Sequence, residues 1–279
     1  GTLSSSLDNS ASTLSARNVV SVSSGRWDAA GTWDCACIPS QGDNVLIRNG
    51  HTITMRSNME CNDLTIGQGV TGEARFTTST ARTLTINGTL TINNGAVLSQ
   101  ATNSNITHTV NLRGNVVNNG TLNLSVDGNS RCNANFIKVN GNQTVSGSGT
   151  TTFYSIVVDK GNKNNVLDIT STNFSCDPDA LTFVSGGTFR FSSSGTNTFQ
   201  LFNSTRDIPS NGAIRMNSVN SVMQFAAGVN LIGDLYVDGG TVQVGNAANE
   251  NLISFGGRLE VNGGSLQIAG RYAPNTGSI

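Results

Sequence analysis

Two stretches near the end of the sequence repeat each other: Leu235-Tyr-Val-Asp-Gly-Gly-Thr-Val-Gln-Val244 and Leu259-Glu-Val-Asn-Gly-Gly-Ser-Leu-Gln-Ile268. When they are aligned, apolar residues coincide in four pairs: Leu235 with Leu259, Val237 with Val261, Val242 with Leu266, and Val244 with Ile268. Apolar and polar residues alternate on both sides of a Gly-Gly pair, which is typical of two short strands joined at a corner. One such unit cannot bury its apolar face alone, so the repetition predicts a stack of units, a solenoid.

Units of the same style recur along most of the chain. Their strand starts lie between 19 and 33 residues apart, at Leu64, Leu84, Val110, Ile137, Ile156, Leu181, Ile214, Leu235 and Leu259. Uneven spacing suits a parallel β-helix, because extra residues can leave the corners while the strands keep stacking. We therefore predict an all-β, right-handed parallel β-helix with an N-terminal capping segment. The alternative fold is a β-sandwich of antiparallel hairpins, since Asn-Gly pairs also favour two-residue hairpin turns.

The expected corners carry Gly after Asn or Asp. A sharp corner often needs a positive φ, which Gly adopts freely and Asn better than most residues. These pairs are Asn87-Gly88, Asn94-Gly95, Asn119-Gly120, Asn140-Gly141, Asp238-Gly239 and Asn262-Gly263.

The composition predicts a surface with few charges. Only 12% of the residues are charged, there are 32 Gly, and the formal net charge is −1. Without a basic stripe we expect no nucleic-acid partner, and without a long apolar run we expect no membrane insertion. The chain begins at Gly1 rather than Met, so we expect a processed product or a fragment of a longer protein.

Residues 1–25 are expected to form a polar cap or an assembly arm. Leu3, Leu7, Ala11 and Leu14 recur at helical spacing, and a solenoid needs its open end covered. As an arm, the segment would instead add a strand to a neighbouring molecule. The residues expected to make that contact are Val19, Val20 and Val22.

Residues 26–66 contain both tryptophans and form the first coils, ahead of the β-helix repeats expected over 67–279. The segment begins Arg26-Trp-Asp-Ala-Ala-Gly-Thr-Trp-Asp-Cys-Ala-Cys-Ile-Pro39 and continues with Gly42-Asp43, Gly50-His-Thr52 and Cys61 shortly before Leu64-Thr-Ile66. It resembles the start of the eight-glycine domain, and especially large bacterial adhesins exported by the type IX secretion route. The resemblance covers about a sixth of the chain. It implies an extracellular or cell-surface β-helical protein.

The five cysteines leave at least one thiol unpaired within the chain. On a strand, Cys35 and Cys37 would point to opposite faces, so we expect Cys61 to pair with one of them. Cys132 and Cys176 are the candidates for a second bridge. A metal site of Cys35, Cys37, His51 and Cys61 is the alternative, although its spacing is not that of a zinc knuckle. We expect no metal and no cofactor.

Catalytic residues are not evident in the sequence. Glycoside hydrolysis requires two carboxylates that flank one bond, and the candidate pairs are Asp177 with Asp179 and Asp234 with Asp238. Such residues usually form turns or a solvated outer face. His51 and His108 lack the partners of a nucleophilic triad. We expect no enzymatic activity, with a polysaccharide-degrading β-helix enzyme as the second alternative.

Binding through an uncharged surface is the expected function. Thr83, Thr85, Thr89 and Thr91 alternate with apolar residues and predict an outward threonine row, while Tyr236 would offer an aromatic ring for sugar stacking. We predict a non-catalytic structural or adhesin module that contacts polysaccharide or a surface protein. The first alternative is a subunit that associates with itself into an extracellular filament.

Overall fold

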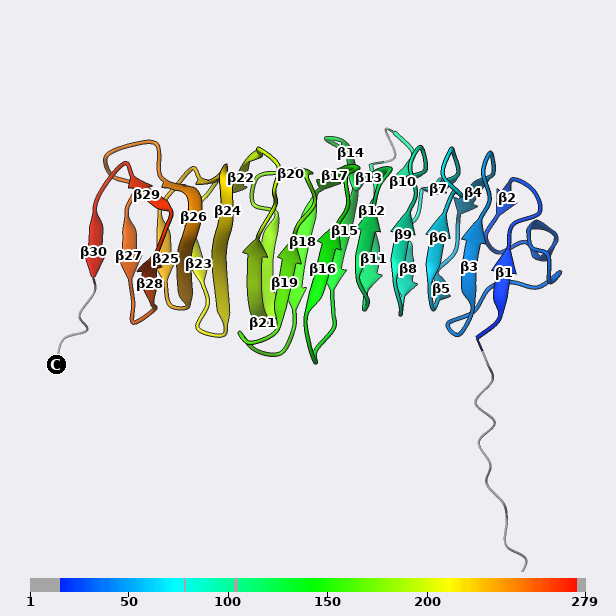
Figure 1. The fold of residues 1–279 in the computed structure, drawn as a ribbon, viewed down its shortest axis with the longest axis horizontal. Coiled ribbons are helices and arrows are strands. Elements are labelled where there is room, and N and C mark those ends of the chain that lie inside the picture. Colours follow the sequence, from blue (N-terminus) through cyan, green and yellow to red (C-terminus); the bar gives the residue numbers. More distant parts are fainter. Residues whose placement is uncertain (1–15, 78, 103–104, 275–279) are drawn as a thin grey trace, which may run out of the picture.

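The chain folds as a β-solenoid of about 11 turns, which confirms the predicted parallel β-helix. The computed structural model describes residues 16–77, 79–102 and 105–274. Successive strands stack side by side along one long axis, with the earliest coils at one end and the latest at the other (Figure 1). The only helical element among the described residues is the 3₁₀ turn η1, Ala30–Thr32.

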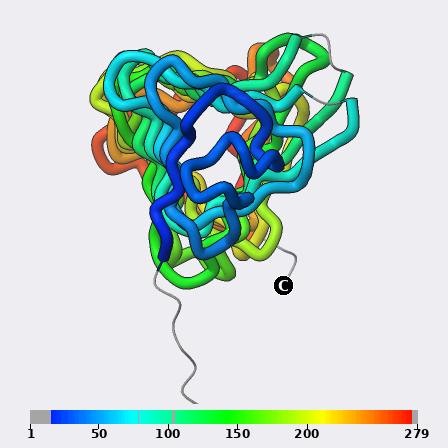
Figure 2. The backbone as a smooth tube through the Cα atoms, turned by 90° about the vertical axis from the view of Figure 1, so that its right-hand side faces the viewer, coloured from blue at the N-terminus to red at the C-terminus, as the bar shows by residue number. Residues whose placement is uncertain are grey.

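Each full turn contributes strands to three faces, and Figure 2 shows the resulting three-sided outline along the axis. The first face, called face 1, runs the whole length of the stack. Its strands are β1 (Asn18–Val20), β3 (Asn44–Ile47), β6 (Leu64–Ile66), β9 (Leu90–Ile92), β12 (Val116–Asn118), β16 (Gln143–Ser146), β19 (Val166–Ile169), parts of β21 (Leu181–Phe191), β24 (Gly212–Phe225) and β26 (Asp234–Val244), and β28 (Leu259–Val261).

Face 2 begins as a seven-stranded sheet of β2 (Gly25–Arg26), β4 (Thr52–Met55), β7 (Glu73–Phe76), β10 (Val97–Gln100), β13 (Thr121–Asn123), β17 (Thr150–Phe153) and β20 (Asn173–Cys176). It continues through β22 (Thr198–Phe202), the second halves of β24 and β26, and β29 (Ser265–Ile268). Strands β24 and β26 therefore bend around a corner and serve two faces. Register shifts at the bend of β24 against β26 accommodate the turn.

Face 3 begins with β5 (Met59–Cys61), β8 (Thr83–Ile86), β11 (Thr107–Leu112), β15 (Ser130–Phe136), β18 (Ser155–Asp159) and the first residues of β21. In the last turns this side is a separate four-stranded sheet of β23 (Arg206–Ile208), β25 (Val229–Leu231), β27 (Leu252–Ser254) and β30 (Tyr272–Pro274). The short strand β14 (Ser125–Asp127) pairs with β15.

The two repeats that predicted the fold stack in the predicted register. All four apolar pairs are partners in parallel pairing of β26 with β28 and β29. Among the described residues, antiparallel contacts are confined to β14 with β15 and an isolated Ser21–Trp33 bridge. The pairing therefore excludes the hairpin-based β-sandwich.

The core is a continuous column of stacked apolar side chains. Leu64, Leu90 and Val116 succeed one another on face 1, and all three are fully buried. In the later turns aromatic rings fill the interior, as with Phe191 and Phe199, whose ring centroids are 4.6 Å apart. Because inward residues are apolar and alternate with outward ones, each coil covers the next.

Residues 16–43 close the N-terminal end, which faces the viewer in Figure 2. Trp27 and Trp33 are buried there edge to face, and the Trp33 Nε1 donates to the Trp27 carbonyl over 2.8 Å. Strand β1 already pairs with β3 of its own chain, and its Val20 carbonyl accepts from the Asp34 amide. The helical spacing predicted at Leu3, Leu7, Ala11 and Leu14 lies outside the described residues.

The proposed assembly residues lie in and just after β1. Val19 is fully buried, Val20 is partly buried and Val22 is exposed. Donating β1 to another molecule would therefore require this strand to leave its own sheet and expose Val19.

Candidate functional site: the outer side of face 1

One line of outward side chains follows face 1 along most of the stack. At the N-terminal end Asn18 is the register partner of Asn44. From β16 onward the line is continuous through successive register partners: Thr144, Asp168, Arg190, Arg215, Tyr236 and Glu260. Neighbouring strands are about 4.8 Å apart, so successive members of this line are close enough to act on one ligand.

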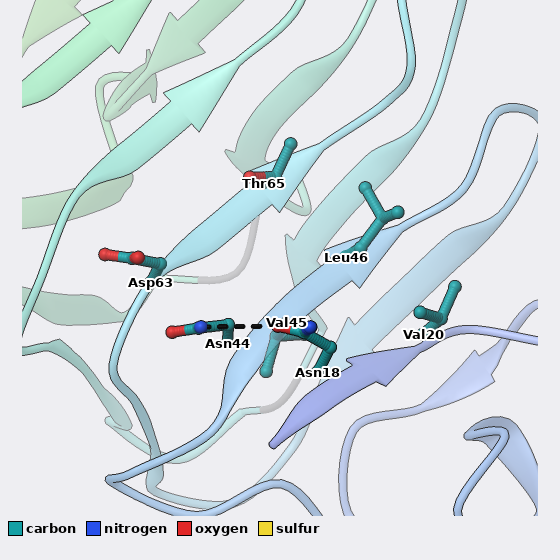
Figure 3. A pocket seen from close by; sticks show the side chains of 7 residues that line it. All are labelled: Asn18, Val20, Asn44, Val45, Leu46, Asp63 and Thr65. Atoms are coloured by element: carbon teal, nitrogen blue, oxygen red, sulfur yellow. Dashed lines mark hydrogen bonds between the residues drawn. The ribbon is translucent and has the colours of Figure 1, made fainter. Parts of the chain in front are cut away.

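The first half of face 1 carries mostly neutral groups, with the Asp63 carboxylate as an exception. Asn62 Nδ2 donates to Asn44 Oδ1 over 2.8 Å, and Asn44 Nδ2 donates to Asn18 Oδ1 over 3.3 Å. Figure 3 shows Val20, Leu46 and Thr65 in a parallel line beside Asn18 and Asn44. The shallow hollow between these lines is lined by apolar side chains, by the amides of Asn18 and Asn44, and by the Thr65 hydroxyl and the Asp63 carboxylate.

The second half of face 1 forms a groove with charged walls. Its floor contains the small residues Thr188 and Ala213, and one wall consists of Arg190, Arg215 and Tyr236. Lys163, Asn164, Val166 and Asp234 complete the lining. The loop that holds Lys163 is anchored to the floor because Thr188 Oγ1 donates to the Lys163 carbonyl over 2.7 Å.

The cations of the groove are more exposed than the carboxylates that hold them. Lys163 contacts Asp234 at 2.7 Å, with side-chain exposures of 38% and 15%. Arg190 contacts Asp168 at 2.6 Å, with exposures of 35% and 9%, and Arg215 pairs with Asp238, with exposures of 43% and 13%. The hydrogen bond to Asp168 raises the pKa of the Arg190 guanidinium against the opposing effect of burial. The groove therefore presents its positive donors to solvent more than the paired carboxylates, of which Asp234 is itself part of the lining.

Tyr236 lies where the sequence led us to expect a binding residue, but its ring is not free. The guanidinium carbons of Arg215 and Arg258 lie 5.4 and 5.6 Å from the ring centroid. Its hydroxyl donates to Asp234 Oδ2 over 3.3 Å. These contacts fix the ring as part of the groove wall, so sugar stacking would require one arginine to move.

The predicted threonine row is divided between two faces. Thr83 and Thr85 belong to β8 on face 3, whereas Thr91 belongs to β9 on face 1 and Thr89 immediately precedes it. All four are partly exposed, as alternation predicts. The prediction of one continuous threonine row is wrong, because the chain turns a corner at Asn87-Gly88 between the two strands.

Both predicted disulfide pairings, Cys61 with Cys35 or Cys37 and Cys132 with Cys176, are wrong. The bridge joins Cys35 to Cys37, while Cys61, Cys132 and Cys176 are free. Residues 35–37 lie in a turn instead of a strand, and the positive φ of Ala36, 49°, brings their side chains to one side.

The three free thiols are held apart inside the stack. Cys132 Sγ donates to Gln100 Oε1 over 3.3 Å, and Cys176 Sγ donates to the Gln200 carbonyl over 3.7 Å. Burial raises the pKa of all three thiols, and that of Cys176 reaches about 12, with a smaller contribution from the charge of Asp177. They are therefore protonated at neutral pH.

Cys35, Cys37, His51 and Cys61, the residues of the alternative metal site, do not form one. His51 Nδ1 shares a 2.8 Å hydrogen bond with Ser21 Oγ, and Cys61 is fully buried in β5. No group of three or more His, Cys, Asp or Glu side chains in the described part of the chain is arranged to hold a metal.

Histidine 108 is an interior residue. It is fully buried and stacks on Phe76 with ring centroids 4.4 Å apart. Burial, with a smaller contribution from the charge of Arg82, lowers the pKa of His108 to about 4. The ring is therefore neutral in neutral solution.

The carboxylates of both candidate pairs are engaged in structural contacts, Asp234 and Asp238 in the ion pairs with Lys163 and Arg215. Asp177 accepts from Ser125 Oγ over 2.8 Å, and Asp179 accepts from the amides of Asn203 and Ser204. These amide bonds help to lower the pKa of Asp179 against the opposing effect of burial. A general acid needs the reverse shift.

Sequence reasoning missed Lys163, Arg190 and Arg215. Arg190 and Arg215 occupy outward positions of alternating segments, Phe189-Arg-Phe191 and Ile214-Arg-Met216. Aligning those segments with Leu235-Tyr-Val237 would have placed both arginines beside Tyr236. Lys163 comes from a loop outside the repeat, so no periodic signal marks it.

Comparison of the chain with protein-family models, with curated proteins and with solved structures finds no match. In the described ranges, no helix has the length and apolar character needed to cross a membrane. The function must therefore be inferred from the chemistry of the molecule's own surface.

Proposed function

We propose that the protein is a non-catalytic structural or adhesin module of a bacterial cell surface that binds an acidic polysaccharide along face 1. The observation that carries the proposal is the groove in which Lys163, Arg190 and Arg215 are partly exposed and their carboxylate partners are less exposed than they are. Guanidinium groups keep donors free after one carboxylate contact, and they suit bidentate binding of another carboxylate.

The form of the molecule supports a polymeric ligand. The groove crosses β19, β21, β24 and β26, so a chain lying in it would run along the stack and meet one coil after another. The neutral amide rows of the first half continue in the same direction. Individually weak contacts repeated along one polymer add up to useful affinity.

An extracellular location is part of the proposal. The Cys35–Cys37 disulfide is a bond that persists in oxidising surroundings and is rare in the cytosol. A surface with few charges and many hydroxyls and amides suits contact with a hydrated glycan layer.

Affinity electrophoresis in gels that contain polygalacturonate or dextran tests the ligand class. The wild type should be retarded by polygalacturonate and not by dextran, and added salt should weaken the retardation. The double variant Arg190→Gln/Arg215→Gln should bind at least about tenfold more weakly, since two charge-assisted contacts are lost. Arg113→Gln, which removes an exposed arginine bonded to Asn87 at the corner between faces 3 and 1, away from the groove, is the matched control.

A second variant separates binding from folding. Arg215→Gln/Asp238→Asn removes the ion pair as a unit and leaves no unpaired buried charge. It should melt as the wild type does and still bind more weakly. Equal retardation by the neutral and acidic polymers, or wild-type binding by the arginine variants, would contradict the proposal.

A further inference from the structure

The disulfide at the N-terminal end closes a very small ring on the surface. Cys35 and Cys37 are two residues apart, their Cα atoms are 5.1 Å apart, and the segment lies outside any strand. Cys35 and Ala36 are exposed, and Cys37 is partly exposed. Attacking thiols therefore have access to the bridge without any opening of the β-helix.

The backbone of this ring is in an unfavourable conformation. Ala36 has a φ of 49°, in the left-handed region that non-glycine residues rarely occupy. Ala36 does not line the core, and its amide donates only to the nearby Trp33 carbonyl over 3.1 Å. Closure of the bridge holds Ala36 in this conformation, so opening the bridge would release it.

The N-terminal cap does not depend on the bridge. Trp33 is fixed by its bond to the Trp27 carbonyl and by edge-to-face packing. Asp34 is fixed to β1 by two contacts, its amide to the Val20 carbonyl and its carboxylate to the Val20 amide, both 2.9 Å. A ring of three residues also restricts the unfolded chain very little. The bridge is therefore of little use as a structural staple.

We propose that the Cys35–Cys37 bridge is a thiol–disulfide exchange site for thiols outside the molecule. Exposed or strained disulfides are the ones that exchange, whereas structural disulfides resist the glutathione pool. Cys61 and Cys132 are buried and Cys176 is partly buried, and burial raises the pKa of all three thiols, so they remain protonated and do not compete in the reaction.

The exchange proceeds in two balanced steps. An external thiolate attacks one sulfur, a mixed disulfide forms, and the other cysteine leaves as a thiolate that takes up a proton. A second external thiol, as its thiolate, attacks the mixed disulfide, which yields the oxidised external disulfide and two protein thiols. The two electrons that reduce the bridge come from the two external thiols.

Native-state reduction tests the proposal. The folded protein is equilibrated without oxygen in glutathione buffers of increasing reducing strength, free thiols are alkylated, and the modified cysteines are identified by mass spectrometry. We expect Cys35 and Cys37 to be alkylated together at millimolar glutathione, with Cys61, Cys132 and Cys176 unmodified and the melting temperature unchanged.

The variant Ala36→Gly isolates the backbone strain. Glycine tolerates the positive φ, so the closed ring becomes more favourable. At one glutathione ratio, we expect its reduced-to-oxidised ratio to be at least about threefold lower than that of the wild type. The proposal is overturned if the bridge is reduced only in denaturant, if the variant and the wild type are reduced equally, or if Cys61 is found joined to Cys35 or Cys37.

Discussion

Lys160 is a cation placed inside the stack without a carboxylate. It is fully buried after β18, and its Nζ donates to Gln143 Oε1 over 2.8 Å. None of the ion pairs formed by the described residues includes it. Burial, assisted by the charge of Lys138, lowers the pKa of Lys160 to about 8. The fold therefore disfavours the ammonium form.

Stability should accordingly rise with pH above 8. Between pH 8 and the ordinary lysine value of 10.5, the unfolded chain holds a proton that the folded chain has released, so rising pH favours folding. The gain is at most about 3 kcal/mol. Urea unfolding of wild type and Lys160→Met at pH 7.5 and pH 10 measures it.

At pH 7.5 the methionine variant should be the more stable protein, because it buries no charge at this site. The difference between the two proteins should shrink towards pH 10, as the wild type sheds its proton on folding. Parallel stability profiles for the two proteins would show that Lys160 does not titrate in this range.

At the scale of the element, the corners show two different uses of glycine. Gly95 and Gly141 have φ values of 74° and 108°, as the Asn-Gly pattern predicts. Gly88 and Gly120 do not have a positive φ. There a Cβ would overlap an oxygen of the adjoining coil, Asp63 Oδ1 or the Ala96 carbonyl. These corners need glycine for space, because stacked coils approach closely.

Substitution of Gly120 by alanine tests this reading of the corner. A methyl group there would push apart the coils around β9 and β12 and should lower the free energy of unfolding by about 2–3 kcal/mol. Gly128→Ala is the matched control, since it also lacks a positive φ and a Cβ there meets nothing within 4 Å. Chemical denaturation measures the free energy of unfolding of both variants. Equal values would contradict close packing at Gly120.

The sequence was sufficient to predict strands, alternation and parallel stacking, but not the assignment of strands to faces. Leu64 lies on face 1 and Leu84 on face 3, so the step between these two starts crosses a corner; the true partner of Leu64 is Leu90. Ile137 was expected to stack on Val110, but it follows the end of β15. The register partner of Val110 is Ala134. All three faces use the same apolar alternation, so the pattern alone cannot distinguish them.

The site was predictable only in part, for a related reason. Tyr236 was visible because an aromatic residue stood at an outward position of a clear repeat. The groove around it depends on Lys163, whose contact with Asp234 joins residues 71 positions apart. The Cys35–Cys37 bridge was missed because a strand geometry was assumed where Ala36 turns the chain.

The whole molecule has two unlike ends. The N-terminal end is sealed by Trp27 and Trp33, both almost fully buried. At the other end Phe255, Val261 and Tyr272 are exposed, and strands β28 to β30 have only one neighbouring coil in the described structure. In a solenoid each coil is stabilised by its neighbours, so the two ends should differ in local stability.

Amide hydrogen exchange followed by mass spectrometry measures this difference. Amides of β28 and β29 should exchange at least about tenfold faster than those of β16 to β19, because opening the last coil breaks only one coil interface. Trp33→Ala should increase exchange in β1 and β3 first and leave β26 unchanged. Uniform protection along the stack would instead indicate one all-or-none unit.

The fixed spacing along face 1 also determines how a long ligand would move. Where neighbouring coils present similar amides, as at Asn18 and Asn44, a polymer shifted by one coil meets almost the same groups and slides with little resistance. Across Asp168, Arg190, Arg215 and Tyr236, only the step between the two arginines repeats a contact, and the other shifts change its sign or its kind. A bound polymer would therefore slide more easily along the first half of the molecule than along the second. The second half would hold it in a preferred register.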